Sequence, residues 1–162
     1  MYLISPASTF VELLNMNKPY AEAAIAGNRA NPKLNGIVKF FKTPFKGILI
    51  ESEIFGLPDD TENESKNFYG MHIHEFGNCT PPFDKTGEHY NPEGSPHPYH
   101  AGDLLPLIGS RGYTYSAFFD NSFDIDDIIG KSVIIHARPD DFTTQPSGNS
   151  GEKIGCGIIK KL

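Results

Sequence analysis

Alternating apolar and polar positions dominate the chain from Tyr20 onward and predict β-strands. The clearest case is residues 46–56, where three isoleucines alternate with two glutamates, so that one face of a strand would be buried and the other solvated. Residues 36–43 are rich in β-branched and aromatic residues, and the short turn at Pro44 between the two segments predicts a hairpin. Further strands are predicted over residues 112–119, 131–138 and 153–162.

Four other parts of the chain do not share this clear pattern. Residues 57–67 are acidic and poor in apolar residues, which predicts a solvated connection. Residues 77–98 contain five prolines, and residues 139–151 form a second long loop. Loops of this length in a compact domain are usually functional or disordered. Residues 21–27 (AEAAIAG) are ambiguous, because alanine favours helix while the neighbouring segments favour strand.

The N-terminal part of the chain carries the weakest signals. Thr9 has a glutamate three residues later and two leucines after that, which is the spacing of a capping box and indicates a short helix. An arm docked by Phe10 and Val11 is an equal alternative. We therefore treat residues 1–19 as an extension without an assigned role and residues 20–162 as a single domain.

Composition narrows the class of protein. A chain of 162 residues suits one domain with one core, and its 16 glycines and 13 prolines fit a turn-rich β domain better than a helical bundle. The net charge of -6 argues against nucleic acid as a partner. No apolar run approaches the ~20 residues of a membrane span, and the N-terminal residues lack the basic and apolar parts of a signal peptide. A cytoplasmic protein that contacts no membrane is therefore expected.

Histidines supply the strongest chemical signal. Five of the six lie between Gly70 and Asp103, and the sixth, His136, falls on a later predicted strand. His72 and His74 are two residues apart on a predicted strand and therefore leave it on the same face. His136 can face the same site from its own strand, which gives a nitrogen-rich set suited to copper or zinc.

A second set of ligands follows in the loop. His97, His100 and Asp103 lie close together, and His89 lies between them and the first set in the sequence. Three histidines and one aspartate make a closed tetrahedral set of the kind that zinc prefers. A zinc peptidase is excluded, because its His-Glu-x-x-His motif would need a second histidine where this chain has Asn78.

Several of these segments together resemble the signatures of the copper/zinc superoxide dismutases. In chain order, over roughly residues 20–160, they are GMHIHEFGNCT (70–80), HAGDL (100–104), IIGKSVIIHA (128–137) and GNSGEKIGCGII (148–159). The resemblance implies an all-β fold, an eight-stranded Greek-key β-barrel or sandwich in which the two long loops carry function. The strands predicted from the apolar pattern agree with that fold.

The resemblance also implies two metal sites that share one ligand. Copper would be bound by His72, His74, His89 and His136, and zinc by His89, His97, His100 and Asp103, with His89 bridging the metals. Asp140 matches the family's carboxylate that joins a copper-ligand imidazole to a zinc-ligand imidazole, here His72 and His97. Cys79 and Cys156 match the family's disulfide, whereas the cytoplasmic setting alone would favour free thiols.

The implied activity is the dismutation of superoxide to oxygen and hydrogen peroxide, with copper cycling between two oxidation states and His89 taking a proton. Lys153 stands where the family has an arginine that holds the anionic substrate, so a fork of donors becomes a point charge on a flexible stem. Asn78 replaces an aspartate found in many members, the link from His97 to His100 is short, and the loop at 142–152 is shortened. These departures are expected to affect the catalytic efficiency more than the presence of dismutase activity.

The resemblance further implies superoxide as the substrate, a homodimer, and a copper chaperone as a partner in metal loading. The alternative is a protein that is not an enzyme, namely a non-catalytic copper-binding or copper-chaperone module with the same fold. The intact copper set and the positive residue at 153 favour the enzyme. A superoxide-quenching assay separates the two hypotheses.

Overall fold

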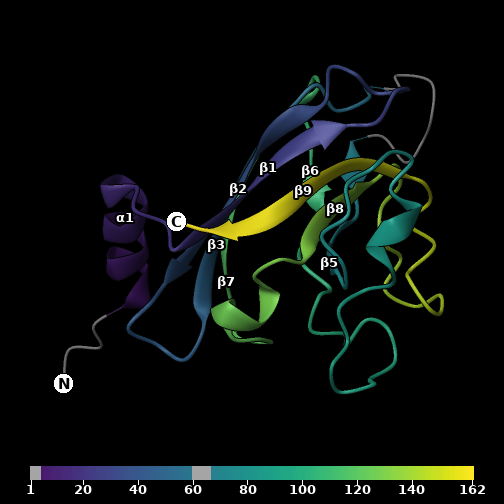
Figure 1. Cartoon of the computed structure of the whole chain (residues 1–162). Helices are drawn as coiled ribbons and strands as arrows, with labels where there is room; N and C mark the ends of the chain where they lie inside the picture. Colours follow the sequence, from purple (N-terminus) through teal and green to yellow (C-terminus); the bar gives the residue numbers. More distant parts are fainter. Residues whose placement is uncertain (1–4, 60–66) are drawn as a thin grey trace.

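A computed structural model describes residues 5–59 and 67–162, and most of their regular structure is β-strand. The main strands are β1 (Ala21–Gly27), β2 (Asn35–Lys42), β3 (Ile48–Phe55), β5 (Met71–His74), β7 (Tyr113–Asp120), β8 (Ser132–His136) and β9 (Lys153–Lys161). They form one curled antiparallel sheet in the order β5-β8-β9-β1-β2-β3-β7 (Figure 1). Non-consecutive neighbours such as β9 beside β1 require long crossover connections, as in a Greek key.

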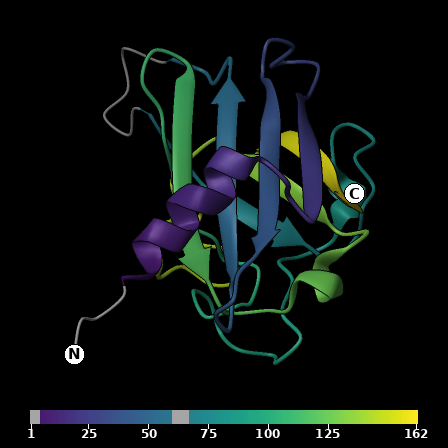
Figure 2. The same ribbon diagram turned by 90° about the vertical axis from the view of Figure 1, so that its left-hand side faces the viewer.

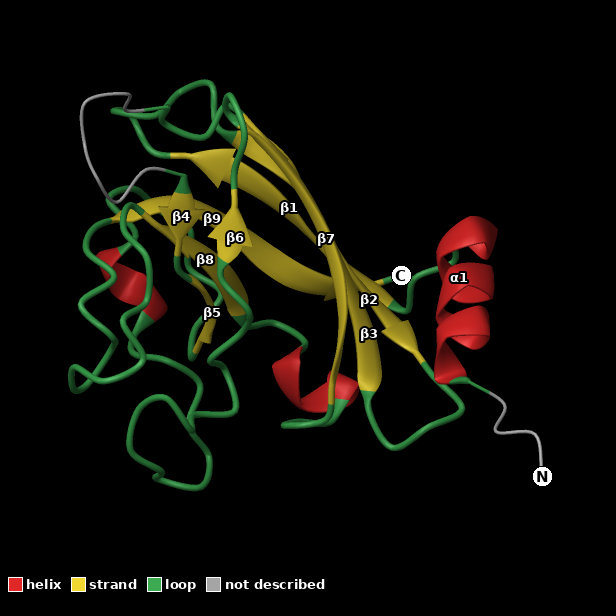
Figure 3. Ribbon diagram, turned by 180° about the vertical axis from the view of Figure 1, so that it is seen from behind, coloured by secondary structure: helices red, strands yellow, loops and turns green. Residues whose placement is uncertain are grey.

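Two short strands, β4 (Phe68–Tyr69) and β6 (Leu107–Ile108), pair with each other at the rim of this sheet (Figure 3). Only Gly70 separates β4 from β5, and β5 pairs with β8, so one stretch of chain belongs to both sheets. The nine strands of the described residues become eight when β4 and β5 are counted as one. The predicted all-β fold is confirmed, as a curled half-barrel with one α-helix.

The predicted hairpin is present, since β2 and β3 pair along their full lengths. In β3 the three isoleucines are buried and the two glutamates lie at the outer face, as their alternation predicts. The ambiguous segment at residues 21–27 is strand β1, held between β9 and β2. Pairing on both sides outweighs the helix propensity of its alanines.

The N-terminal segment forms helix α1 (Pro6–Met16), which crosses the outer face of the large sheet (Figure 2). The expected capping box at Thr9 is wrong, because Ser5 is the N-cap and Pro6 opens the first turn with its fixed φ. Phe10 docks the helix by packing against Phe45 and Phe119. Val11 does not dock, since 55% of it stays exposed.

The two long loops lie at the end of the molecule remote from α1 (Figures 1 and 3). The loop at residues 77–98 contains one turn of 3-10 helix, η1 (Asp84–Thr86). A second turn of 3-10 helix, η2 (Ile125–Ile128), lies outside both loops and precedes β8. Of the acidic segment at 57–67, residues 60–66 lie outside the described residues, and Leu57 is buried in the core. No helix among the described residues is long and apolar enough to span a membrane.

Strand β8 is shorter than the strand predicted over residues 131–138. It ends at His136 after a register shift against β9 between Ile135 and His136. The next two backbone N–H groups bond to loop carbonyls instead, Ala137 to Glu152 and Arg138 to Ser150. The shift breaks the regular ladder at the point where the strand enters the site.

Candidate metal centre

Strand β5 carries the first two histidines of the site. Every residue of β5 is buried, and Met71 and Ile73 belong to the main hydrophobic core. Because side chains alternate along a strand, His72 and His74 lie on the opposite face. Burying both faces of this short strand leaves its histidines no contact with bulk water.

The edge of β5 that does not face β8 forms backbone hydrogen bonds with the loop segments that carry the other ligands. The Ile73 N–H donates to the Gly102 carbonyl at 2.9 Å, and the Tyr90 N–H donates to the Ile73 carbonyl at 2.8 Å. Isolated bridges therefore set His74 beside His89 and His72 beside Asp103. The loop both covers an edge strand and delivers side chains to the site.

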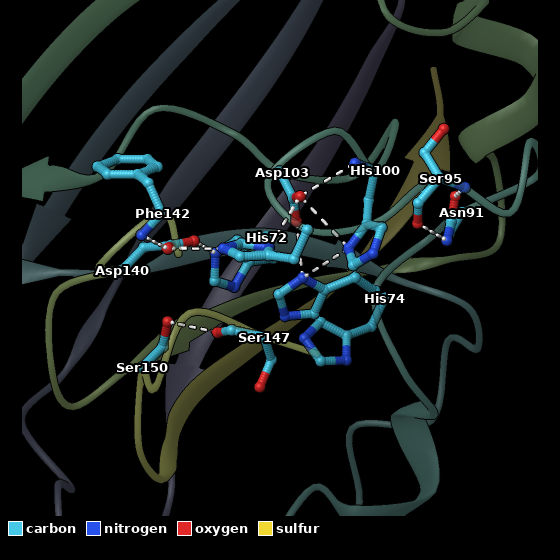
Figure 4. A network of polar contacts seen from close by, with 12 residues as sticks. His72, His74, Asn91, Ser95, His100, Asp103, Asp140, Phe142, Ser147 and Ser150 are labelled. Atoms are coloured by element: carbon cyan, nitrogen blue, oxygen red, sulfur yellow. Dashed lines mark hydrogen bonds and ion pairs between the residues drawn. The ribbon is translucent and has the colours of Figure 1, made fainter. Parts of the chain in front are cut away.

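Two groups of potential ligand atoms result, each with all its atoms within 4.8 Å of one another. The four-histidine group consists of His72, His74, His89 and His136, and all four side chains are buried. The His/Asp group consists of His89, His97, His100 and Asp103. His89 belongs to both, and Figure 4 shows His72, His74, His100 and Asp103 converging on this region.

Hydrogen bonds fix which nitrogen of each histidine in the four-histidine group is free. The carbonyl oxygens of Gly87 and Gly151 only accept, so His74 Nδ1 donates to the first at 2.9 Å and His136 Nδ1 to the second at 3.1 Å. Their Nε2 atoms keep lone pairs and lie 3.3 Å apart. His72 donates from Nε2 to Asp140, which leaves its Nδ1 with the lone pair.

The His/Asp group is arranged around one carboxylate. Asp103 Oδ1 accepts from His89 Nδ1 at 2.7 Å, and Oδ2 lies 3.0 Å from His97 Nδ1 and 3.3 Å from His100 Nδ1. Burial raises the pKa of Asp103, but the His89 hydrogen bond and the charges of the three histidines outweigh this and lower it. The carboxylate is therefore ready to bind a cation.

Unpaired nitrogens test whether metal ions fit these groups. Among the described residues, four buried side-chain atoms lack a hydrogen-bond partner. One is an oxygen of Glu51, which is ion-paired with Lys39, and the others are His72 Nδ1, His89 Nε2 and His97 Nδ1. His97 Nδ1 lies near Asp103 but has no proton to donate to it, because the ring donates from Nε2 to Asp140. Buried polar atoms without partners are costly. All three nitrogens belong to the two ligand groups, so bound cations would satisfy them.

Burial keeps His72, His74 and His136 neutral, which is the form of histidine that binds metal. Burial, and after it the charge of His72, lowers the pKa of His136 to about 3. The pKa of His74 is lowered mainly by burial and then by His136, and that of His72 is lowered mainly by burial. No proton competes strongly for these nitrogens near neutral pH.

Asp140 ties the two groups together from outside. Its Oδ2 accepts from His72 Nε2 and its Oδ1 from His97 Nε2, each at 2.8 Å (Figure 4). Burial raises its pKa, but the hydrogen bonds from His72, the Phe142 N–H and His97 hold that pKa well below the usual range. A fixed carboxylate of this kind sets ring orientation, so Asp140 lies where its predicted role requires.

Comparison with known proteins identifies the family. Residues 34–159 match the family model for copper/zinc superoxide dismutase. Since that match spans most of the chain, it decides the assignment. This chain belongs to the copper/zinc superoxide dismutase family.

Individual relatives include both enzymes and chaperones of this superoxide dismutase family. Superoxide dismutase [Cu-Zn] 3 of Arabidopsis thaliana is 33% identical, over 86% of this chain and 88% of its own. Superoxide dismutase [Cu-Zn] of Schizosaccharomyces pombe is 32% identical, over 84% of this chain and 96% of its own. The copper chaperone for superoxide dismutase of Sus scrofa is 31% identical over 86% of this chain, which spans only about half (53%) of the chaperone.

A solved structure supports the same superoxide dismutase fold. The crystal structure of the clock protein EA4 superposes with a TM-score of 0.74 at 26% identity, over 89% of this chain and 96% of that one. The similarity therefore extends over most of this chain and nearly all of the other.

Lys153, at the family's arginine position, is held by two hydrogen bonds. Its Nζ donates to the Thr86 hydroxyl at 2.9 Å and to the Gly87 carbonyl at 3.0 Å. Burial lowers the pKa of Lys153, and the charges of Glu88 and Asp84 act against this. The Gly87 carbonyl also accepts from His74, so the ammonium lies one carbonyl away from the four-histidine group.

The predicted disulfide is confirmed. Cys79 and Cys156 are bonded with an S–S distance of 1.97 Å across 77 residues of sequence. The bond joins the loop before η1 to β9 and packs with Phe83 and Ile134 in a small buried cluster. The family signature supplied this pairing, which two isolated cysteines in a sequence would not.

Several residues of the site were not predicted. The carbonyls of Gly87 and Gly151 orient His74 and His136, and Gln145 and Gly148 contact His97 or its carboxylate partner. Backbone carbonyls carry no sequence signal, because every residue has one. Glycines in a loop likewise do not reveal which side chain they approach.

Proposed function

We propose that this protein is a superoxide dismutase, which converts two superoxide ions and two protons to one oxygen and one hydrogen peroxide. The observation that carries the proposal is the pair of ligand groups joined by His89, with one ring nitrogen turned to each. Copper, when bound, would supply a one-electron redox couple that takes an electron from one superoxide ion and gives it to the next. Zinc has no redox chemistry and serves structure.

Donor types support the assignment of metals to groups. The four-histidine group offers lone pairs from His72 Nδ1 and from the Nε2 atoms of His74, His89 and His136. A nitrogen-only set suits copper, whereas three histidines with one carboxylate form the closed set that zinc prefers. His89, His97, His100 and Asp103 would therefore hold zinc.

His89 and Lys153 have the proposed catalytic roles. His89 Nε2 is buried beside the other copper-ligand nitrogens and has no hydrogen-bond partner, so it can hold a proton for transfer to reduced oxygen. His89 Nδ1 faces Asp103 in the His/Asp group, so zinc bound there would keep the ring in place. Lys153 presents a fixed positive charge near His74 and so favours binding of an anion.

A non-catalytic copper-chaperone module is the second candidate. The similarity to copper chaperones and the lysine in place of arginine favour it. A chaperone must release copper, however, and the four-histidine group here is buried and oriented by hydrogen bonds at three of its rings. These features favour an enzyme that retains its metal.

A superoxide-decay assay tests the proposal. Full-length protein loaded with copper and zinc should accelerate the decay of superoxide catalytically, whereas protein loaded with zinc alone should not. A His74→Ala variant should lose this activity, because it removes one copper ligand. Stoichiometric consumption of superoxide without turnover by the copper-loaded wild type would favour the module instead.

Assembly and location remain parts of the proposal. A homodimer is expected, and size-exclusion chromatography with light scattering measures it directly. Delivery of copper by a chaperone is expected to raise copper occupancy beyond that reached with free copper in a reconstituted system. Cytoplasmic location stays a prediction, which fractionation of the native source tests.

A further inference from the structure

Gln145 makes a contact with His97 that the proposed function does not use. The His97 N–H donates to Gln145 Oε1 at 3.0 Å, and Gln145 Nε2 donates to the His97 carbonyl at 2.6 Å. One side-chain amide thus satisfies both backbone polar groups of a ligand residue. Two hydrogen bonds between planar groups fix position and orientation together, which a single bond does not.

The same loop holds the imidazole ring of His97. Asp140 accepts from His97 Nε2 at 2.8 Å, and Gly148 lies directly against this pair. A Cβ at position 148 would stand 2.0 Å from Asp140 Oδ1 and 2.7 Å from His97 Nε2, and its φ of +65° also favours glycine. The loop therefore holds His97 at two places, through Gln145 at the backbone and through Asp140 at Nε2. Nδ1 alone is left to face Asp103.

The residue after Gln145 forms part of a cavity wall. Pro146 lines a cavity of about 400 Å³ beside two ligands of the His/Asp group, His89 and His100. Glu75 and Glu88 line the same cavity and give it acidic character. An opening of this kind offers a route for a cation to or from the His/Asp group. Pro146 follows Gln145 directly in the chain, and the Gln145 side chain is held by two hydrogen bonds to His97.

We propose that Gln145 is a positioning residue that retains zinc. It fixes the backbone of His97 so that Nδ1 stays directed at the ion, and it keeps Pro146 against the cavity beside His100. The inference rests on the zinc site of the proposed function and adds a residue to it. Gln145 provides no ligand atom, so it acts through His97 and through the wall of the cavity.

Two substitutions at position 145 test this role in the copper- and zinc-loaded full chain. Gln145→Ala removes both hydrogen bonds, and Gln145→Glu keeps an acceptor for the His97 N–H but sets an oxygen against the His97 carbonyl. Zinc release into a chromogenic chelator should be about 10-fold faster or more with alanine, and also faster than wild type with glutamate. Copper release should change by less than about twofold, because the four-histidine group has its own hydrogen bonds.

Two further measurements separate positioning from a general structural role. Hydrogen exchange of the His97 amide should accelerate in Gln145→Ala, which removes its acceptor, and less in Gln145→Glu, which keeps one. Cobalt(II) placed in the zinc position should show an altered visible spectrum in Gln145→Ala, since that spectrum reports ligand geometry. Glu93→Ala, at an exposed position of the neighbouring loop, is the matched control and should change none of these.

Unchanged zinc release in both variants would overturn the proposal. Equal acceleration of copper and zinc release, together with lower stability of the metal-free chain, would also overturn it and indicate a merely structural role. Zinc release needs no superoxide, so a chain that retains zinc but lacks dismutase activity refutes the proposed function alone. A wild type that takes up no stoichiometric zinc would refute the role of Gln145 and the zinc assignment, whereas superoxide decay with the copper-loaded chain tests the dismutase function separately.

Discussion

His89 is the residue through which the two ligand groups are coupled. Its Nδ1 donates to Asp103 at 2.7 Å, while its Nε2 is buried among the nitrogens of the four-histidine group without a partner. His89→Ala is therefore expected to lower the affinity for both copper and zinc, each by about 10-fold or more. Metal content per chain after dialysis against competing chelators measures the effect.

The control for this prediction is Asp103→Asn. Asp103 contacts three members of the His/Asp group, so its replacement should lower zinc occupancy and leave copper occupancy largely intact. Unchanged zinc affinity in His89→Ala would show that the ring does not bridge the two metals.

The same histidines predict how the metal-free protein responds to pH. The pKa of His136 is about 3 in the folded chain against 6.5 for the free side chain, and the pKa values of His72 and His74 are also lowered. Below pH 6.5 the unfolded chain thus binds protons that the folded chain does not. The free energy of unfolding should fall as the pH drops, by up to about 1.4 kcal/mol per pH unit for each neutral histidine.

Urea unfolding of the metal-free protein between pH 7.5 and 4.5 measures this loss. Carboxylates with lowered pKa values, such as Asp140, contribute only at more acidic pH, so this window isolates the histidines. Metal-loaded protein should lose less stability over the upper part of the window, because bound metal excludes protons from the same nitrogens. A stability independent of pH in the metal-free chain would contradict the prediction.

At the scale of elements, the disulfide joins a loop to a strand. Cys79 lies in the loop that leads to η1 and to Thr86 and Gly87, which bind Lys153 of β9, and Cys156 lies on β9 itself. Reduction should lower the free energy of unfolding by about 4–5 kcal/mol in the chain-entropy model for a loop of this span. It should also increase hydrogen exchange in residues 77–98.

Thermal unfolding and hydrogen exchange, with and without a reductant, test this expectation on the metal-loaded protein. A Cys79→Ser/Cys156→Ser double variant is the control, since a reductant should then have no further effect. Two titratable thiols in native protein with full superoxide dismutase activity would mean that the proposed activity does not need the bond.

At the scale of the whole molecule, net charge and local charge act in opposite directions on an anionic substrate. The net charge of -6 repels superoxide, and screening by salt would then speed the reaction. The positive charge of Lys153 attracts superoxide, and the Coulomb energy of two unit charges about 5 Å apart in water is about 0.8 kcal/mol. Charges on distant parts of the surface lie beyond the ~10 Å screening length at 0.1 M salt and so contribute less. The near charge should dominate, so the second-order rate should fall as ionic strength rises.

Stopped-flow rates at increasing salt test this balance. Lys153→Ala should lower the rate about fourfold and flatten its dependence on salt, and Lys153→Arg should retain or raise the rate, because arginine restores a fork of donors. Lys18→Ala, at an exposed position beside α1, is the control and should behave as wild type. A rate that rises with salt would show that the global repulsion dominates.

The sequence by itself determined the strands and the identity of the ligands. Alternation of period two requires only local chain geometry, so it predicted β3 and the shared face of His72 and His74 correctly. The β-branched and aromatic residues of β2 predicted that strand. The family signatures added the fold, the disulfide and the two ligand sets, because they encode a whole tertiary arrangement in a few short motifs.

Tertiary structure alone decided how those ligands are held. Which nitrogen of each histidine is free depends on carbonyls of Gly87 and Gly151 and on Asp140, which reach the rings from distant segments. The end of β8 and the two hydrogen bonds between Gln145 and His97 also depend on contacts formed only after folding. Backbone groups are alike in every residue, so their partners are set by the path of the chain in space.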